Sequence, residues 1–208
     1  MNMSLNDKPQ IFDFFSKSWS VYMPFFSQIF SRSRFLQIHW MLHVSPVQTG
    51  RQIRASKVQN LISYVQDKCL ELFIPGRDIA VDESTIGFKG RLAFKMYNPQ
   101  KPTKWGLRMY VLADCTSGYI SVFKPHFGKE STDSLIRPDL PFATRIVVAL
   151  LEQLLMKSNG DGFHLFTDRF YTSYQLALEA LNVNIHLTGT VQKNRKELPE
   201  DLKKIKKM

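Results

Sequence analysis

The spacing of apolar residues changes at Pro75-Gly76, and this change constrains the fold more than any other feature of the sequence. Before it, apolar residues recur every three or four positions from Val58 to Leu72, which predicts a helix that Ser56 can cap. After it, short apolar runs predict strands, and two longer segments keep the helical spacing. The expected strands are 79–81, 107–112, 119–123, 164–167 and 185–191, and the expected helices are 143–157 and 173–181. This order of strands and helices predicts an α/β fold.

The first 76 residues are expected to form a helical region. A further helical pattern runs from Phe35 to Leu42, and aromatic residues are frequent between positions 12 and 40. Because aromatic side chains are usually buried, we expect them to fill a small helical core. The predicted organisation is therefore a helical region at 1–76, a sheet region at 77–192 and a basic tail at 193–208.

The net charge favours a polyanionic partner. The chain carries 28 Lys and Arg against 18 Asp and Glu, which gives a formal charge of +10. This balance fits nucleic acid, although ribosomal and membrane-surface proteins share it. The two cysteines, Cys69 and Cys115, are too distant in sequence for a CxxC zinc pair and too few for a disulfide framework. The cysteine count therefore favours a reduced, intracellular setting. Since no apolar stretch reaches the ~18 residues of a membrane span, we expect no membrane partner.

Two aspartates follow predicted strands. Asp82 comes directly after the run 79–81, and Asp168 comes directly after 164–167. Neighbouring parallel strands lie ~4.8 Å apart, so two such carboxylates can share a pair of Mg²⁺ ions ~3.5–4 Å apart. Asp also ends strands because it forms turns and caps helices, so spacing alone leaves both interpretations open.

Three ordered blocks of sequence surround these aspartates. Asp82 lies in IAVDES at 79–84, which is followed by GFKGR at 87–91 and KMYNPQKPTKWG at 95–106. Asp168 lies in FTDRFYTS at 166–173, and GTVQKNRKELP follows at 189–199. In order, the blocks resemble the segments around the first and second catalytic aspartates of the piggyBac-type transposases, and the strand and basic turn that follow in that family.

The resemblance implies an RNase H-like catalytic domain of the DDE class. The expected fold is α/β, with an N-terminal helical region followed by an incomplete RNase H-like mixed sheet with flanking helices. Asp82 and Asp168 would be catalytic residues and ligands of Mg²⁺ or Mn²⁺ in an enzyme that nicks transposon ends, forms hairpins and inserts DNA at TTAA sites. Residues 1–76 would correspond to the dimerisation and DNA-binding part. The resemblance also implies DNA as partner and nuclear localisation, and it allows for a homodimer.

One departure from the family concerns its third acidic ligand. In the family this ligand lies well beyond the position of Lys193, and no residue of this chain corresponds to it. Glu197, Glu200 and Asp201 match the turn after the strand, so the role is not transferred to them. A chain truncated before this ligand is expected to hold metal poorly and to be inactive alone. The alternative is a domesticated, non-catalytic DNA-binding protein derived from a transposable element.

A basic segment, residues 89–108, lies between the two aspartates. It contains six cations and no acidic residue, with Phe94, Tyr97 and Trp105 interleaved. Cations neutralise phosphates and aromatic rings stack on unpaired bases, so the composition predicts DNA contact, although a solvated hairpin has the same appearance. The basic tail fits nucleic acid, nuclear import or simple solvation. The candidate DNA-binding residues are Lys89, Arg91, Lys95, Lys101, Lys104, Arg108, Arg169, Lys193 and Arg195.

Overall fold

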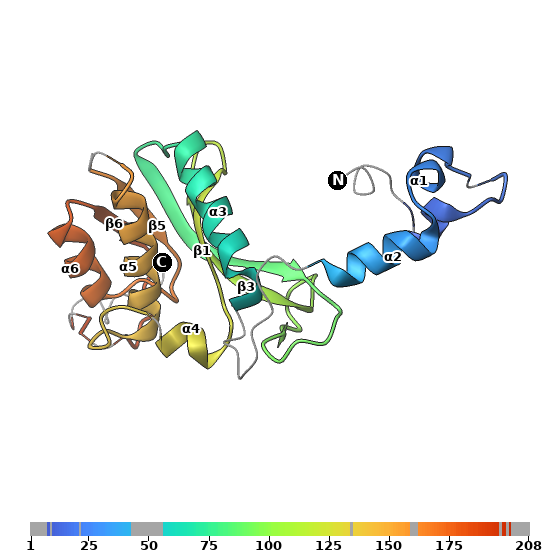
Figure 1. The fold of residues 1–208 in the computed structure, drawn as a ribbon. Coiled ribbons are helices and arrows are strands. Elements are labelled where there is room, and N and C mark those ends of the chain that lie inside the picture. The colour runs from blue at the N-terminus through green and yellow to red at the C-terminus, as the bar shows by residue number, and fades with distance from the viewer. Residues whose placement is uncertain are drawn as a thin grey trace. The chain divides into compact units, whose positions relative to one another are not determined.

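Two units, Met1–Gly50 and Arg51–Met208, make up the computed structural model of the chain (Figure 1), and each is described by itself. The structure describes residues 8, 10–20, 22–42, 56–133, 135–158, 162–195, 197, 198 and 200.

In its described residues, the first unit contains three short helices. They are η1 (Ile11–Phe15), α1 (Pro24–Ile29) and α2 (Arg32–Met41). Phe14 and Phe26 are buried and pack edge to face with ring centroids 4.8 Å apart. Trp19 and Trp40 are 93% and 73% exposed, so the aromatic core expected here is confined, among the described residues, to a small cluster around Phe14. Helices of five to ten residues present too little surface to cover so many rings.

The second unit is a six-stranded mixed sheet with flanking helices. Its strands run in the order β2-β3-β1-β5-β6, and β4 pairs with β3. The pairs β1–β5 and β5–β6 are parallel, whereas β1–β3, β2–β3 and β3–β4 are antiparallel. The elements are α3 (Ser56–Leu72), β1 (Asp78–Gly87), β2 (Met96–Tyr97), β3 (Trp105–Asp114), β4 (Ile120–Pro125), α4 (Lys129–Asp133), α5 (Phe142–Leu155), β5 (His164–Thr167), α6 (Tyr174–Asn182) and β6 (His186–Gly189).

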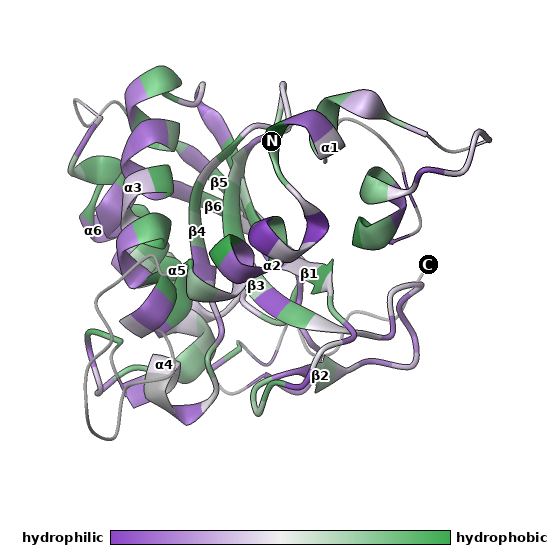
Figure 2. Cartoon of the chain, turned by 45° about the vertical axis from the view of Figure 1, so that its right-hand side comes forward, coloured by the Kyte–Doolittle hydropathy of each residue, from purple (hydrophilic) through white to green (hydrophobic). Residues whose placement is uncertain are grey.

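The core lies on one face of this sheet. Side chains alternate between the two faces of a strand, and Ile79 and Val81 of β1 are fully buried on the core face. Helix α5 packs there with α6 beside it, and Leu150 in the middle of α5 is 0% exposed. Figure 2 shows the hydrophobic colour along the central strands and along α5.

Helix α3 belongs to the same unit as the sheet. Leu70 is part of the core cluster, the Tyr119 hydroxyl donates to the Cys69 carbonyl at 3.1 Å, and Gln66 donates to the Phe123 carbonyl in β4. The observed units therefore divide at Gly50, whereas the sequence-based description placed this helix with the first 76 residues.

Strand β1 is longer than expected. The sequence predicted that it ends at Asp82, but it continues to Gly87 because Ser84, Thr85 and Ile86 pair with Met109, Arg108 and Leu107 of β3. The two-residue strand β2 and the five-residue helix α4 were not predicted, since segments this short show no periodicity.

The predicted fold class is confirmed: the chain is α/β, with a helical N-terminal region followed by a mixed sheet and flanking helices. In the part of the chain that the structure describes, none of the helices has the length and apolar character needed to cross a bilayer.

Asp114 fixes the connection between α3 and the sheet. Its carboxylate is buried at the end of β3 and accepts hydrogen bonds from the backbone of Gly76 at 2.9 Å, from the backbone of Ser117 at 2.7 Å and from the Ser117 hydroxyl at 2.7 Å. The hydrogen bond from the Ser117 hydroxyl, followed by those from the backbone, lowers the pKa of Asp114 below its usual range.

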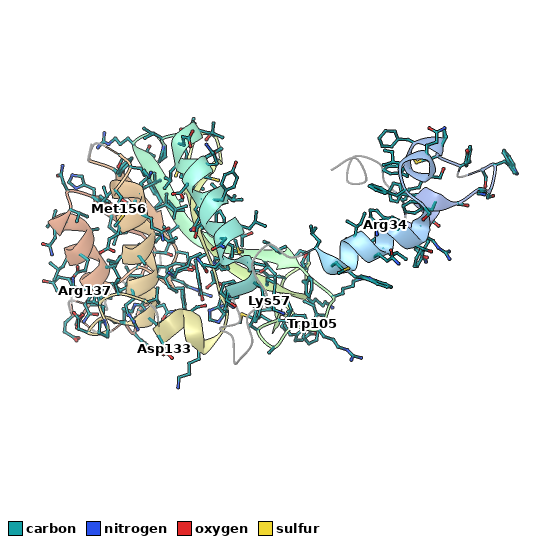
Figure 3. All side chains as sticks on the ribbon, in the orientation of Figure 1. Arg34, Lys57, Trp105, Asp133, Arg137 and Met156 are labelled. Atoms are coloured by element: carbon teal, nitrogen blue, oxygen red, sulfur yellow. The ribbon has the colours of Figure 1, made fainter. Side chains whose placement is uncertain are left out.

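We expect Asp114→Asn to lower the melting temperature at pH 7 by on the order of 5 °C. Because the folded-state pKa is depressed, the stabilisation by Asp114 is complete above the unfolded pKa of ~3.9 and is lost as the pH falls through the folded value. Thermal unfolding from pH 7 to pH 2.5 should therefore show a smaller acid-induced decrease in the variant. Asp133→Asn, at an exposed position labelled in Figure 3, is the control and should follow the unsubstituted chain. An equal acid-induced decrease in Asp114→Asn would contradict this account.

Candidate active site

The parallel pairing of β1 with β5 places Asp82 and Asp168 at neighbouring positions. Val81 and Thr167 are the last partners in this register, and the two aspartates follow them directly. Val81 and Thr167 are buried on the core face, whereas Asp82 and Asp168 are exposed. With neighbouring strands ~4.8 Å apart, the two carboxylates share one end of one strand pair. Asp82 thus lies within β1 rather than at its end, but at the point where the pairing with β5 stops.

Each carboxylate uses one oxygen to hold its own backbone. Asp82 Oδ1 accepts from the Glu83 backbone at 2.7 Å, and Asp168 Oδ1 accepts from the backbones of Phe170 at 2.9 Å and Tyr171 at 3.4 Å. Asp168 therefore forms the turn that its residue type favours. The Oδ2 atoms of both residues have no hydrogen-bond partner among the described residues.

Tyr171 lies close to both aspartates and was not found by sequence reasoning. It is 1% exposed, and its hydroxyl has no hydrogen-bond partner in the described part of the chain. Burial raises the pKa of Tyr171, and the neighbouring Glu83, Tyr110, Asp82 and Asp168 raise it further. The hydroxyl is therefore a buried group without a hydrogen-bond partner among the described residues. In the sequence, nothing distinguishes this tyrosine from an ordinary core residue.

The donor set at this position fits a hard divalent cation. Among the described residues, no group of three or more His, Cys, Asp or Glu side chains converges as a complete metal site. Mg²⁺ is commonly held by one or two carboxylates, with water and substrate phosphates as its other ligands. Two adjacent carboxylates with one unbonded oxygen each meet that requirement, whereas a structural zinc site needs four protein ligands.

Three of the predicted DNA-binding residues, all in the basic segment, are engaged within the protein. Lys95 Nζ donates to the Gly90 carbonyl at 3.0 Å and lies 4.9 Å from the Trp105 ring centroid. Lys101 Nζ donates to the Glu83 carbonyl at 3.3 Å, and Arg108 Nε lies 3.5 Å from Glu83 Oε2. Lys101 and Arg108 thus support the strand that carries Asp82, whereas Lys95 holds the segment between β1 and β3.

A second group of predicted DNA-binding residues has exposed side chains, which have no hydrogen-bond or ion-pair partner among the described residues. Its members are Lys89, Arg91, Lys104, Arg169 and Lys193. Arg195 differs from them, because its guanidinium donates to backbone carbonyls of the loop that follows Asp168.

An aromatic pair lies where β2 pairs with β3. Tyr97 and Trp105, the latter labelled in Figure 3, have ring centroids 4.6 Å apart and are 51% and 49% exposed. Side chains alternate between the two faces of a strand, so Asp82 lies on the face opposite to Val81. The register of β1 and β3 places Trp105 on that same face as Asp82. The exposed rings, together with Lys89, Arg91 and Lys104, therefore belong to the β1–β3 ribbon and the segment that joins its two strands.

The chain matches a transposase family model along its whole length. The family model described as Transposase IS4 matches residues 1–208. The human PiggyBac transposable element-derived protein 3 is 27% identical over 183 residues, which is 87% of this chain and 30% of that protein. The human Chimeric ERCC6-PGBD3 protein is also 27% identical over 183 residues, which is 17% of its length. The chain thus spans less than a third of the curated relatives that it matches.

A solved structure has the same fold. The cryo-EM structure of a piggyBac transposase synaptic complex with hairpin DNA superimposes with a TM-score of 0.71 and 25% sequence identity, over 92% of this chain and 39% of that one. The resemblance inferred from the sequence blocks is confirmed by these matches. The chain therefore belongs to the transposase IS4 family, in which it is of the piggyBac type.

Proposed function

We propose that Asp82 and Asp168 are two ligands of a Mg²⁺- or Mn²⁺-dependent site of a piggyBac-type transposase that cuts and transfers DNA strands. The observation that supports this most is the parallel register of β1 and β5, which puts the two aspartates at adjacent positions. The comparisons do not favour a non-catalytic DNA-binding protein over this function.

The residues of this chain have separate roles in the proposed reaction. Asp82 and Asp168 each offer one unbonded carboxylate oxygen, and their other oxygens keep the backbone in place. These two residues would hold a divalent cation, which would supply charge neutralisation at the phosphate and activation of the attacking oxygen. Tyr171 offers a buried hydroxyl donor, and the exposed Arg169 offers a cation for phosphate.

DNA is the proposed partner. The formal charge of +10 and the exposed cations Lys89, Arg91, Lys104, Arg169 and Lys193 favour a phosphate backbone. The Tyr97–Trp105 pair offers a surface for an unpaired base. The relative of known structure was solved with hairpin DNA, which supports the same partner. The proposal also includes insertion at TTAA sites, nuclear localisation and a homodimer. These three points rest on the resemblance to the piggyBac-type transposases.

Mg²⁺ should strengthen DNA binding by the unsubstituted chain at constant ionic strength, because a cation on the two aspartates also binds phosphate oxygens. The double variant Asp82→Asn/Asp168→Asn should lose this Mg²⁺-dependent increase in DNA affinity. It should still bind DNA in the absence of Mg²⁺. Fluorescence anisotropy of a labelled hairpin oligonucleotide measures both. If Mg²⁺ only weakened binding by the unsubstituted chain, as an ordinary salt does, the proposed site would be wrong.

Arg91→Glu and Lys104→Glu should each weaken DNA binding by about tenfold and reduce the slope of log K against log salt by about one or more. Lys157→Glu changes the net charge equally but lies beyond the end of α5, so it should leave the slope nearly unchanged. Salt titrations of the three variants provide the comparison. Equal losses in all three would show that net charge alone governs binding.

A further inference from the structure

Arg195 holds the loop that carries Asp168. Its Nε donates to the Thr172 carbonyl at 3.1 Å, and its Nη2 donates to the Phe170 carbonyl at 2.6 Å. Both carbonyls belong to the turn that begins at Asp168. The guanidinium thus bridges two points of this turn from a segment more than twenty residues later in the chain.

The same loop is tied to β5 from the other side. The Thr172 backbone donates to the Asp168 carbonyl at 3.0 Å, and the Thr172 hydroxyl donates to it at 2.7 Å. The hydroxyls of Thr172 and Thr167 are 2.8 Å apart. Arg195 therefore completes a network in which residues 168–172 are held at both ends.

The segment after β6 crosses this region at a second place. Gln175 Nε2 donates to Glu197 Oε1 at 3.2 Å, and β6 itself approaches closely at Gly189. A Cβ atom at Gly189 would overlap the Thr172 hydroxyl and lie 2.5 Å from the Thr167 carbonyl oxygen. The close approach shows that this segment packs against the loop and does not project from it.

Arg195 differs from the free cations in its exposure and in its hydrogen bonds. Lys193, two residues earlier, is exposed and has no partner among the described residues, whereas Arg195 is half-buried and has two carbonyl acceptors. The planar fork of arginine donates along fixed directions to two acceptors at once, which the single ammonium group of lysine does not do. Position 195 thus uses the shape of arginine as well as its charge.

We propose that Arg195 is a positioning residue that orients the Asp168 carboxylate for a divalent cation, rather than a DNA-phosphate contact. The inference rests on the proposed function, because it acts through the metal site formed by Asp82 and Asp168. Without the fork, the Phe170 and Thr172 carbonyls lose their donors, and the turn that aims Asp168 becomes free to move.

Titration of Mn²⁺, followed by its electron paramagnetic resonance signal, tests this inference on three variants of the full chain. Arg195→Gln and Arg195→Lys should both weaken Mn²⁺ binding by about 10- to 100-fold, as is typical when a residue that orients a ligand is lost. Their DNA-binding salt slopes should remain those of the unsubstituted chain. Lys193→Gln, the matched control, should keep its Mn²⁺ affinity and lose about one unit of salt slope. Amide hydrogen exchange should increase at residues 170–172 in both Arg195 variants, and melting temperatures verify that each variant is folded.

Two results would overturn the inference alone: normal Mn²⁺ affinity in Arg195→Lys, or normal Mn²⁺ affinity with a reduced salt slope in Arg195→Gln. If the unsubstituted chain itself did not bind Mn²⁺, the proposed function would be overturned, and this inference with it.

Discussion

Asp82→Asn and Asp168→Asn should each weaken Mn²⁺ binding by about 100-fold or more. Loss of a residue that only orients a metal ligand typically costs 10- to 100-fold, so loss of a charged ligand should cost at least as much. Asparagine keeps the size of the side chain and an oxygen that can accept the backbone hydrogen bonds of the turn, so the fold should be preserved. Titration of Mn²⁺ at fixed ionic strength measures the change.

Asp78→Asn is the control for this experiment. Asp78 lies on the same strand as Asp82 and pairs with His164, at the opposite end of the β1–β5 register. Its replacement removes the same charge but should change Mn²⁺ affinity by no more than about twofold, since exposed charges more than ~10 Å apart are largely screened at 0.1 M salt. Equal losses in Asp78→Asn and Asp82→Asn would indicate a diffuse attraction of cations rather than a site.

Leu150→Ala should lower the free energy of unfolding by about 2–5 kcal/mol. Leu150 is 0% exposed and lies in the middle of α5 on the core face of the sheet, so truncation leaves a cavity among close-packed neighbours. Urea denaturation measures the change. Leu181→Ala makes the same substitution in α6 at a residue that is 61% exposed, and it should change stability by no more than about 0.5 kcal/mol. Similar losses at both positions would mean that α5 is not the main cover of the sheet.

The elements that were predicted well are those whose burial is regular. Val147, Leu150 and Leu154 lie on one face of α5, and all three are buried. Strand β5 spans the predicted residues 164–167 because its apolar run ends abruptly at Asp168. Local sequence determines such elements, since each has one face that only a core can cover.

The elements that were missed depend on pairing with distant residues. The extension of β1 to Gly87 follows from its partners in β3, and β2 exists only through its pairing with Trp105 and Gly106. The aromatic residues of the first unit were expected to be buried, yet Trp19 is exposed because the short helices there form no larger core in the described residues.

The sequence alone pointed to the two carboxylates of the candidate site, but not to the residues that surround them. Asp82 and Asp168 follow apolar runs, and parallel pairing of those runs brings both to one end. The hydrogen bonds of Lys101 and Arg195, by contrast, join residues 18 and more positions apart and leave no periodic signal in the sequence. These two cations, predicted to contact DNA, support the backbone near the aspartates in the structure.

The two aspartates are proposed to form one and the same cation site. Fe²⁺ in place of Mg²⁺, with ascorbate and peroxide, generates hydroxyl radicals that cut the backbone near the bound ion. Mass spectrometry of the fragments should show cuts at both 81–84 and 167–171, and excess Mg²⁺ should suppress them together. Cuts confined to one of these segments, or unaffected by Mg²⁺, would contradict the claim.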